Sequence, residues 1–267
     1  MKYGFIGCGK MASALLQGAL QSGLFAAGDV TLSDAIPAAS EALSRQTGAR
    51  AVATNAEVAA AADLLVLCVK PQDALAAVRE IGGALAGKLL ISIVAGLPLA
   101  TLQSAAPPGA RLVRVMPNTP ALIHRGATAY ALGASATEED AAAVERFFRA
   151  VGTVARVKEP LLDVVTGLSG SGPAFAYLVV EALADGGVLM GLPRDLALQL
   201  AAQTVAGSAE MVLKTGQHPA ALRDQVTSPG GTTIAGIEAL EKNGARAALI
   251  AAVRAATERA RELGAAK

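Results

Sequence analysis

The stretch "FIGCGKMA", residues 5 to 12, limits the possible fold more than any other part of this chain. Gly7, Gly9 and Ala12 form a G-x-G-x-x-A pattern directly after an apolar strand and at the start of a helix. Gly7 permits a tight turn, Gly9 lets backbone amides approach a pyrophosphate, and Ala12 allows close packing of helix on strand. The pattern predicts a dinucleotide-binding turn, and the alternative is an ordinary glycine-rich turn.

Short apolar runs alternate with Ala-rich helical stretches from residue 2 to about 157, which is typical of βαβ units. Runs that are apolar throughout, such as "LLVLCV", indicate a mostly parallel sheet covered on both faces. Helices are predicted to open near Lys10, Pro37, Pro71, Pro98 and Thr137. Strands are predicted at Tyr3–Ile6, Val30–Ser33, Leu64–Val69, Leu89–Val94, Leu112–Val115, Ala127–Ala131 and Val154–Val157.

The pattern changes after "KEP" at 158–160, because only helical patterns follow. We therefore expect two domains: residues 1–159 bind a dinucleotide, and residues 160–267 form a helical domain. The stretch 172–191 is apolar on nearly all sides, which a small domain cannot bury alone. A partner chain is therefore expected.

Composition narrows the class of partner. The net charge is +1 and no Lys/Arg run occurs, so a small molecule is favoured over nucleic acid or a membrane surface. The longest uncharged run, 89–110, is interrupted by Gly and Pro, and the first residues show no signal-peptide pattern. Cys8 and Cys68 have no metal-type spacing, so we expect no metal site and a reducing, cytoplasmic setting.

Asp34 ends the second predicted strand, where a carboxylate accepts a hydrogen bond from the 2′-hydroxyl of the adenosine ribose. Its charge would repel a 2′-phosphate, and no Arg follows within a few positions, so charge favours NADH over NADPH. In the alternative, Asp34 caps the helix near Pro37 and Ser33 faces the ribose.

Three further segments, "CVKPQ", "VAGLP" and "VMPNTP", follow strands at the edge where open α/β sheets bind ligands. They are expected to line the cofactor cleft, with Lys70 and Asn118 as contacts. The alternatives are a solvated lysine and a turn-forming asparagine.

The helical domain has few groups able to exchange a hydroxyl proton. His124 and His218 are the only histidines of the chain, and no lysine occurs between Lys158 and Lys214. Alcohol oxidation usually needs such a base, whereas hydride addition to a C=N bond does not, since the nitrogen can already carry its proton. The sequence therefore favours an imine substrate.

The segments "GFIGCGKMA", "CVKPQ", "VMPNTPA", "GLSGSGPAF" and "SPGGTTIAGIEALE", in this order, resemble the pyrroline-5-carboxylate reductase family over nearly the whole chain. The resemblance implies reduction of 1-pyrroline-5-carboxylate to L-proline with NADPH or NADH, the last step of proline biosynthesis. It also implies a Rossmann-type doubly wound sheet followed by an all-helical dimerisation domain, with some members assembling dimers into decamers. The family often prefers NADPH, and Asp34 departs from the small polar or basic residues common there.

The resemblance also assigns site residues. Substrate contacts fall on Ser228, Gly230, Gly231, Thr232 and Thr233, and Glu159 matches a position near the nicotinamide end. Cofactor contacts fall on Ile6, Gly7, Cys8, Gly9, Lys10, Met11, Asp34, Asn55, Val69, Lys70, Pro71, Ala95 and Gly96.

The turn "SPGGTT" supports this assignment on physical grounds. Successive amides of a Pro-Gly-Gly turn that leads into a helix form a nest for one carboxylate, and Thr233 adds a hydroxyl for the ring nitrogen. Thr233 is the candidate catalytic residue. The alternative is an ordinary helix start, with Ser228 as the cap and Pro229 at the first position.

Two other functions compete with this one. A β-hydroxyacid dehydrogenase would carry a lysine a few residues after Gly170-Ser171-Gly172, where this chain has "PAFA". A non-catalytic dinucleotide-binding protein would need no substrate nest.

Overall fold

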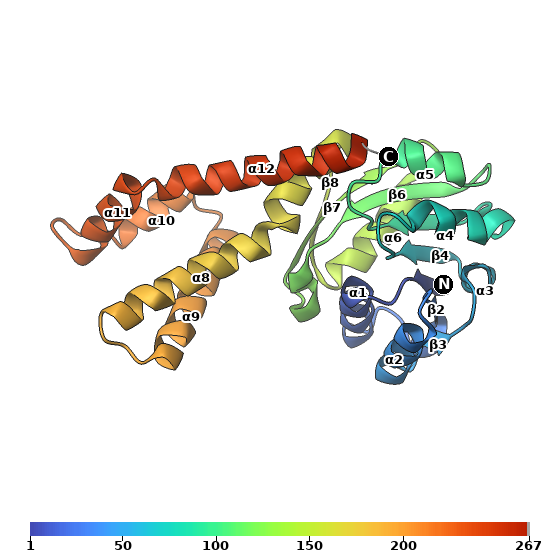
Figure 1. Cartoon of the computed structure of the whole chain (residues 1–267), viewed down its shortest axis with the longest axis horizontal. Coiled ribbons are helices and arrows are strands. Elements are labelled where there is room, and N and C mark those ends of the chain that lie inside the picture. The colour runs from blue at the N-terminus through green and yellow to red at the C-terminus, as the bar shows by residue number, and fades with distance from the viewer. Residues whose placement is uncertain (266–267) are drawn as a thin grey trace. The chain divides into compact units, whose positions relative to one another are not determined.

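The computed structural model describes residues 1–265, which form two compact units. Among the described residues, the first unit comprises Met1–Ser171 together with Ala255–Ala265, and the second comprises Gly172–Arg254. The predicted fold class is confirmed: an α/β sheet unit is combined with an all-helical one (Figure 1). Residues 160–171, expected in the helical domain, cluster with the sheet unit, where Leu162 is fully buried.

The first unit is built on one eight-stranded sheet in the order β3-β2-β1-β4-β5-β6-β7-β8. Every pairing is parallel except that of β6 with β7, so the predicted mostly parallel sheet is confirmed. The strands are β1 Tyr3–Ile6, β2 Val30–Ser33, β3 Arg50–Ala51, β4 Leu64–Leu67, β5 Leu89–Ser92, β6 Arg111–Met116, β7 Gly126–Leu132 and β8 Gly152–Arg156.

Helices cover both faces of this sheet and bury two separate apolar clusters. One face carries α1 Lys10–Gln21, α2 Pro37–Thr47 and α6 Glu138–Arg149. The other carries α3 Asn55–Ala61, α4 Ala74–Ile81 and α5 Leu99–Ala105. Short α7, Leu162–Val165, adds Leu162 to the second cluster. Burial on both faces explains why the central strands are apolar throughout.

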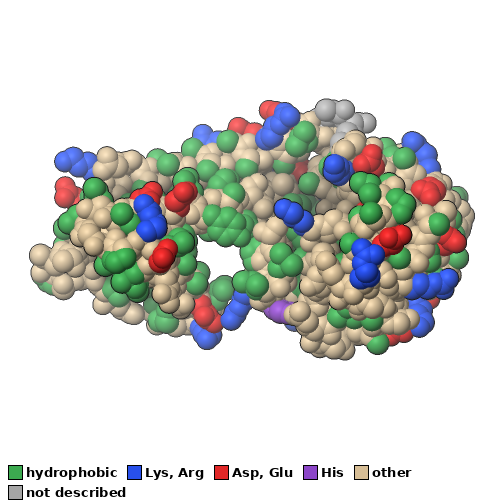
Figure 2. Space-filling view, turned by 60° about the horizontal axis from the view of Figure 1, so that its bottom comes forward, with side chains coloured by type: hydrophobic (Ala, Val, Ile, Leu, Met, Phe, Trp, Pro, Cys, Tyr) green, Lys and Arg blue, Asp and Glu red, His purple; other side chains and the backbone are tan. Residues whose placement is uncertain are grey.

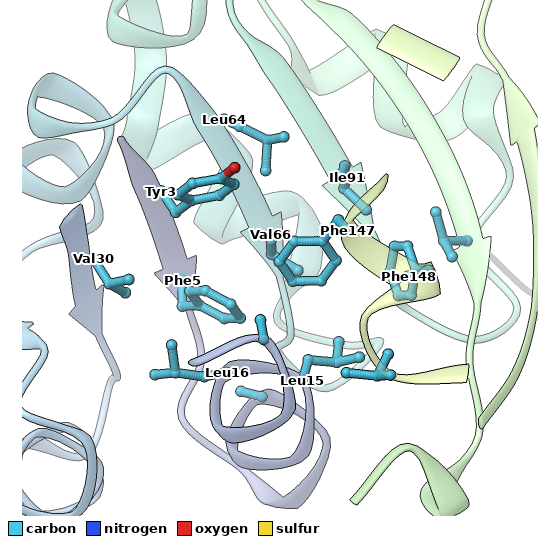
Figure 3. Packing of buried hydrophobic residues seen from close by; sticks show 14 of the residues in the cluster. Tyr3, Phe5, Leu15, Leu16, Val30, Leu64, Val66, Ile91, Phe147 and Phe148 are labelled. Atoms are coloured by element: carbon cyan, nitrogen blue, oxygen red, sulfur yellow. The ribbon is translucent and has the colours of Figure 1, made fainter. Parts of the chain in front are cut away.

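The aromatic side chains of the sheet unit gather in the cluster under α1 and α6. Phe147 lies 5.0 Å from Phe148 and 6.3 Å from Phe5 between ring centroids. Leu15 and Leu16 of α1 pack into the same cluster (Figure 3). This packing fixes α1, whose first residues lie at the carboxyl edge of the sheet.

The structure differs from the prediction at the start of one helix and in two elements that were not predicted. The helix expected near Pro71 begins at Ala74, because residues 71–73 form a turn in which the Asp73 amide donates to the Lys70 carbonyl. Strand β3 and helix α3 were not predicted. A capping box starts α3, since Thr54 and Glu57 exchange side-chain and backbone hydrogen bonds.

The second unit consists of helices only and buries very little of itself. Its elements are α8 Gly172–Leu189, α9 Arg194–Thr215, α10 Pro219–Gln225, α11 Thr232–Lys242 and the first part of α12 Ala245–Ala265. Helices α8 and α9 pack through Ala184, Ala197 and Ala201, whereas Tyr177 and Leu178 are about two-thirds exposed. Apolar side chains spread over the molecular surface (Figure 2).

Candidate functional site

Besides the short β3, five strands of the sheet unit end at one edge, because β1, β2, β4, β5 and β6 all run parallel. The segments that follow them are Gly7–Gly9, Asp34–Ile36, Cys68–Pro71, Ile93–Gly96 and Pro117–Asn118. The predicted cofactor residues on these segments are therefore brought to the same edge, which is where open α/β sheets bind ligands.

Gly7 occupies a position that other residues cannot take without strain. Its φ is +93°, and a Cβ built there would lie 2.8 Å from the backbone carbonyl of Cys68. Its amide donates to the Ser33 carbonyl at 2.9 Å, so the turn is tied to the end of β2. The tight turn expected at Gly7 is therefore present.

Gly9 leaves open the space in front of helix α1. It is the N-cap residue, its own side-chain position meets nothing within 4 Å, and no side chain caps the helix. The first amides of a helix lack acceptors within it and carry a partial positive charge. An anion such as a pyrophosphate fits this site, whereas a side chain at position 9 would fill it. Ala12 is fully buried beneath the turn.

Asp34 holds the glycine turn and the start of α2 together. Its carboxylate accepts the Cys8 amide at 2.7 Å and the Ile36 amide at 2.8 Å. The N-cap residue of α2 is Ile36, whose side chain makes no cap hydrogen bond. Asp34 lies two residues earlier, so it is not the N-cap residue, which was the alternative role for it. A carboxylate has about four acceptor positions, so Asp34 retains capacity for a ribose hydroxyl.

A cavity of about 290 Å³ opens beside Gly7 and Asp34. Asn55 and Val69, both predicted cofactor contacts, also line it. The remaining lining residues are Ala35, Ala53, Asp73, Ala76, Ala77 and Glu80. This arrangement fits the adenosine end of a dinucleotide whose phosphates rest on α1.

Asn118 and Glu159 both have partners within the protein. Asn118 is nearly buried, and its side chain accepts the Ala127 amide at 2.8 Å and donates to the Ser169 carbonyl at 3.0 Å. Glu159 accepts the amide of Leu99, the first residue of α5, at 2.6 Å and lies 3.4 Å from Arg114. Both side chains therefore brace the loops at the sheet edge.

The two cysteines lie in the same region, and their thiols are uncharged. Burial and, second, the charge of Asp34 raise the pKa of the Cys8 thiol to about 12. Burial and, second, Cys8 raise the pKa of Cys68 above its ordinary value. The thiols are therefore protonated near neutral pH and pack as small apolar side chains.

The turn "SPGGTT" of the second unit has the backbone of an anion nest. Gly230 has φ +65°, the Gly231 amide donates to the Ser228 carbonyl at 3.1 Å, and α11 begins at Thr232. The N-cap residue is Gly231, with no side-chain cap, so the alternative start at Ser228 and Pro229 is wrong. The first-turn amides of α11 are open to a ligand anion, with the partly exposed Thr233 beside them.

Comparison with known proteins matches two parts of the chain to two different families. Residues 2–96 match the family described as NADP oxidoreductase, coenzyme F420-dependent. Residues 159–263 match the family described as pyrroline-5-carboxylate reductase dimerisation. The first match covers the glycine turn and Asp34, and the second covers the "SPGGTT" turn.

Full-length relatives decide the family. The pyrroline-5-carboxylate reductase of Methanosarcina acetivorans is 48% identical, covering 98% of each chain. That of Arabidopsis thaliana is 48% identical, covering 98% of this chain and 95% of the relative. The chain belongs to the pyrroline-5-carboxylate reductase family. The solved structure of the Plasmodium falciparum pyrroline carboxylate reductase, with NADP bound, is 35% identical with a TM-score of 0.90, covering 99% of this chain and 98% of that one.

Family membership establishes the reaction. The protein is an NAD(P)H-dependent oxidoreductase that reduces 1-pyrroline-5-carboxylate to L-proline, the last step of proline biosynthesis. The dimerisation family also shows that the chain assembles into oligomers.

Asp73 and Glu80, which line the cavity, were not among the predicted site residues. Glu80 lies near the end of α4, 25 positions after its partner Asn55, and no sequence motif marks it. Only the fold of the sheet unit brings the two residues together.

Proposed function

We propose that the sheet unit binds the dinucleotide with its pyrophosphate at the start of α1 and its adenosine in the cavity beside Asp34, and that NADH is the preferred cofactor. The single observation that carries the preference is the Asp34 carboxylate at the cavity wall. A 2′-phosphate there would meet a negative charge. The NADP bound to the Plasmodium relative supports the other cofactor, so the preference needs a direct test.

The test compares kcat/KM for NADH and NADPH in the wild type and in Asp34→Ser. We expect the wild type to favour NADH and the substitution to shift the ratio towards NADPH. Glu41→Gln, which removes an exposed charge of α2, should leave the ratio unchanged. A wild-type preference for NADPH that Asp34→Ser does not alter would refute the charge argument.

We also infer the roles of the substrate turn. The amides near Gly231 and Thr232 hold the substrate carboxylate, and the Thr233 hydroxyl bonds the ring nitrogen and orients the C=N bond. When bound, the dinucleotide supplies the hydride. The protein contributes orientation and a fixed dipole, since the imine nitrogen can carry its own proton. Ser228 and Gly230 shape the turn. The Ser228 hydroxyl leaves no room for a side chain at Gly231, and Gly230 has a positive φ.

Removing the Thr233 hydroxyl tests this assignment. A hydrogen bond to a charged partner contributes roughly 1.5–3 kcal/mol, so Thr233→Val should lower kcat/KM about 10–150-fold. Thr233→Ser should keep most of the activity, and Thr215→Val, a hydroxyl removed from the end of α9, should keep all of it. Unchanged kcat/KM in Thr233→Val would eliminate the role.

We propose a homodimer as the minimum assembly, further association into a decamer, and a cytoplasmic location without nucleic-acid or membrane partners. Two stretches, Glu159–Leu189 and Arg194–Thr215, are long and apolar enough to cross a membrane by length and composition only. Residues 159–263 match a dimerisation family, which favours burial of these stretches against a second copy of the chain. The same match supports residues 160–267 as the substrate-binding and dimerisation domain. Light scattering and fractionation test these proposals.

A further inference from the structure

Two carboxylates at the adenosine cavity already bind the donors that a phosphate would need. Asp34 accepts the amides of Cys8 and Ile36. Glu80 accepts the Asn55 amide at 3.2 Å and the Asn55 side-chain nitrogen at 2.6 Å. Proteins bind phosphate through such donors or through Arg and Lys side chains.

The orientation of Asn55 follows from its partners. A carboxylate can only accept, so the Asn55 NH₂ group must face Glu80. The Asn55 oxygen then accepts the Ser33 hydroxyl at 2.7 Å, and Ser33 is buried. Both ends of the Asn55 amide are therefore occupied, and its nitrogen cannot serve a phosphate unless it leaves Glu80.

The charge at the cavity has one sign. Of the ten described residues that line it, three carry carboxylates, namely Asp34, Asp73 and Glu80, and none carries a Lys or Arg side chain. Asp73, the N-cap residue of α4, contributes a charge, and its side chain makes no cap hydrogen bond to the helix. Glu80 contributes both a charge and the hydrogen bonds that hold Asn55.

We infer from this geometry that Glu80 is a second specificity-determining residue, which disfavours a phosphate at the ribose 2′ position by holding Asn55 and by like-charge repulsion. The inference rests on the proposed placement of adenosine in this cavity. It does not depend on which cofactor the wild type prefers, because it concerns only how much Glu80 lowers the affinity for a ligand with a 2′-phosphate.

Binding of adenosine fragments to the full chain without cofactor isolates this effect. Calorimetry with 2′,5′-ADP and 5′-AMP compares ligands that differ only in the 2′-phosphate. Removing one nearby like charge in Glu80→Gln should tighten 2′,5′-ADP about 3–10-fold and change 5′-AMP by less than about twofold. The ratio of kcat/KM for NADPH over NADH should rise by a similar factor.

Two further variants separate the causes. Asp73→Asn removes a charge from the same cavity and leaves both Asn55–Glu80 hydrogen bonds, whereas Glu80→Gln keeps only one acceptor oxygen for Asn55, so the Asp73→Asn shift should be smaller. Glu41→Gln, outside the cavity, should cause none. An Asp73→Asn shift equal to that of Glu80→Gln, or no Glu80→Gln shift at all, would overturn the role of Glu80. If 5′-AMP fails to compete with NADH, the proposed cofactor site itself is wrong, and the inference with it.

Discussion

Gly7 and Gly9, two residues apart in one turn, are glycines for different reasons. Gly7 has a positive φ and no space for a Cβ even in the free protein. Gly9 has an ordinary backbone conformation and open space, so only a bound pyrophosphate would contact a side chain there. The glycine pattern predicted both roles from the sequence, but the structure is needed to show which one is required for folding.

The two alanine substitutions should therefore affect different properties of the protein. Gly7→Ala should cost about 1–3 kcal/mol of unfolding free energy, because the strained backbone and the Cys68 carbonyl oppose it. Gly9→Ala should leave the unfolding free energy nearly unchanged but weaken dinucleotide binding. Thermal denaturation and cofactor titration on both variants measure this. An equal loss of unfolding free energy in both variants would show that position 9, like position 7, needs glycine for folding and not for dinucleotide binding.

At the scale of elements, Arg114 of β6 joins the strand to the segment after β8. Its guanidinium lies 2.9 Å from Asp163 and 3.4 Å from Glu159, and only 7% of the Arg114 side chain is exposed. Glu159 in turn accepts the first amide of α5. The ion group therefore positions the start of α5, which directly follows the predicted cofactor loop at Ala95 and Gly96.

Arg114→Met tests this element. It leaves two carboxylates without their cation, so we expect a loss of about 2–4 kcal/mol of unfolding free energy, somewhat below that for a fully buried pair. Arg149→Met breaks an exposed pair with Glu145 and should cost less than about 1 kcal/mol. Denaturant titration of both compares the two pairs. Equal losses would show that Arg114 does not brace the sheet edge.

Elements with strong patterns were predictable, and those set by distant contacts were not. Strands β1 and β2 match their predicted bounds, because each is a short run of mostly apolar or β-branched residues, buried throughout and followed by a turn. Strand β3 has only two residues, and α3 has seven, too few for periodicity to identify them. The site residues on the glycine turn carry a local motif, whereas Glu80 gains its position only through tertiary packing.

At the scale of the whole molecule, the exposed apolar face of α8 is the main feature that a single chain leaves without cover. Leu178 is 65% exposed and is not part of the cluster through which α8 packs on α9 at Ala184. Large exposed apolar faces usually mark interfaces, and the match of this region to a family described by dimerisation supports a role in oligomerisation.

Leu178→Arg should therefore dissociate the oligomer or lower its affinity by at least tenfold, with activity falling at low protein concentration. Ile123→Arg, an equally drastic change at an exposed site of the sheet unit, should not alter the mass. Light scattering over a concentration series makes the comparison. An unchanged mass for Leu178→Arg would remove this face of α8 from the interface.

Helix α12 has a consequence for the order in which the protein is completed during synthesis. Its last part belongs to the sheet unit, where Leu263 lies close to Gly96. The sheet unit is thus made from both ends of the chain, with the helical unit translated in between. We expect a ribosome-bound nascent chain to form the strands early but to lack the final contact at the Gly96 loop until residue 263 has left the exit tunnel. Stalled chains of increasing length, probed for protease resistance and dinucleotide binding, would reveal that delay.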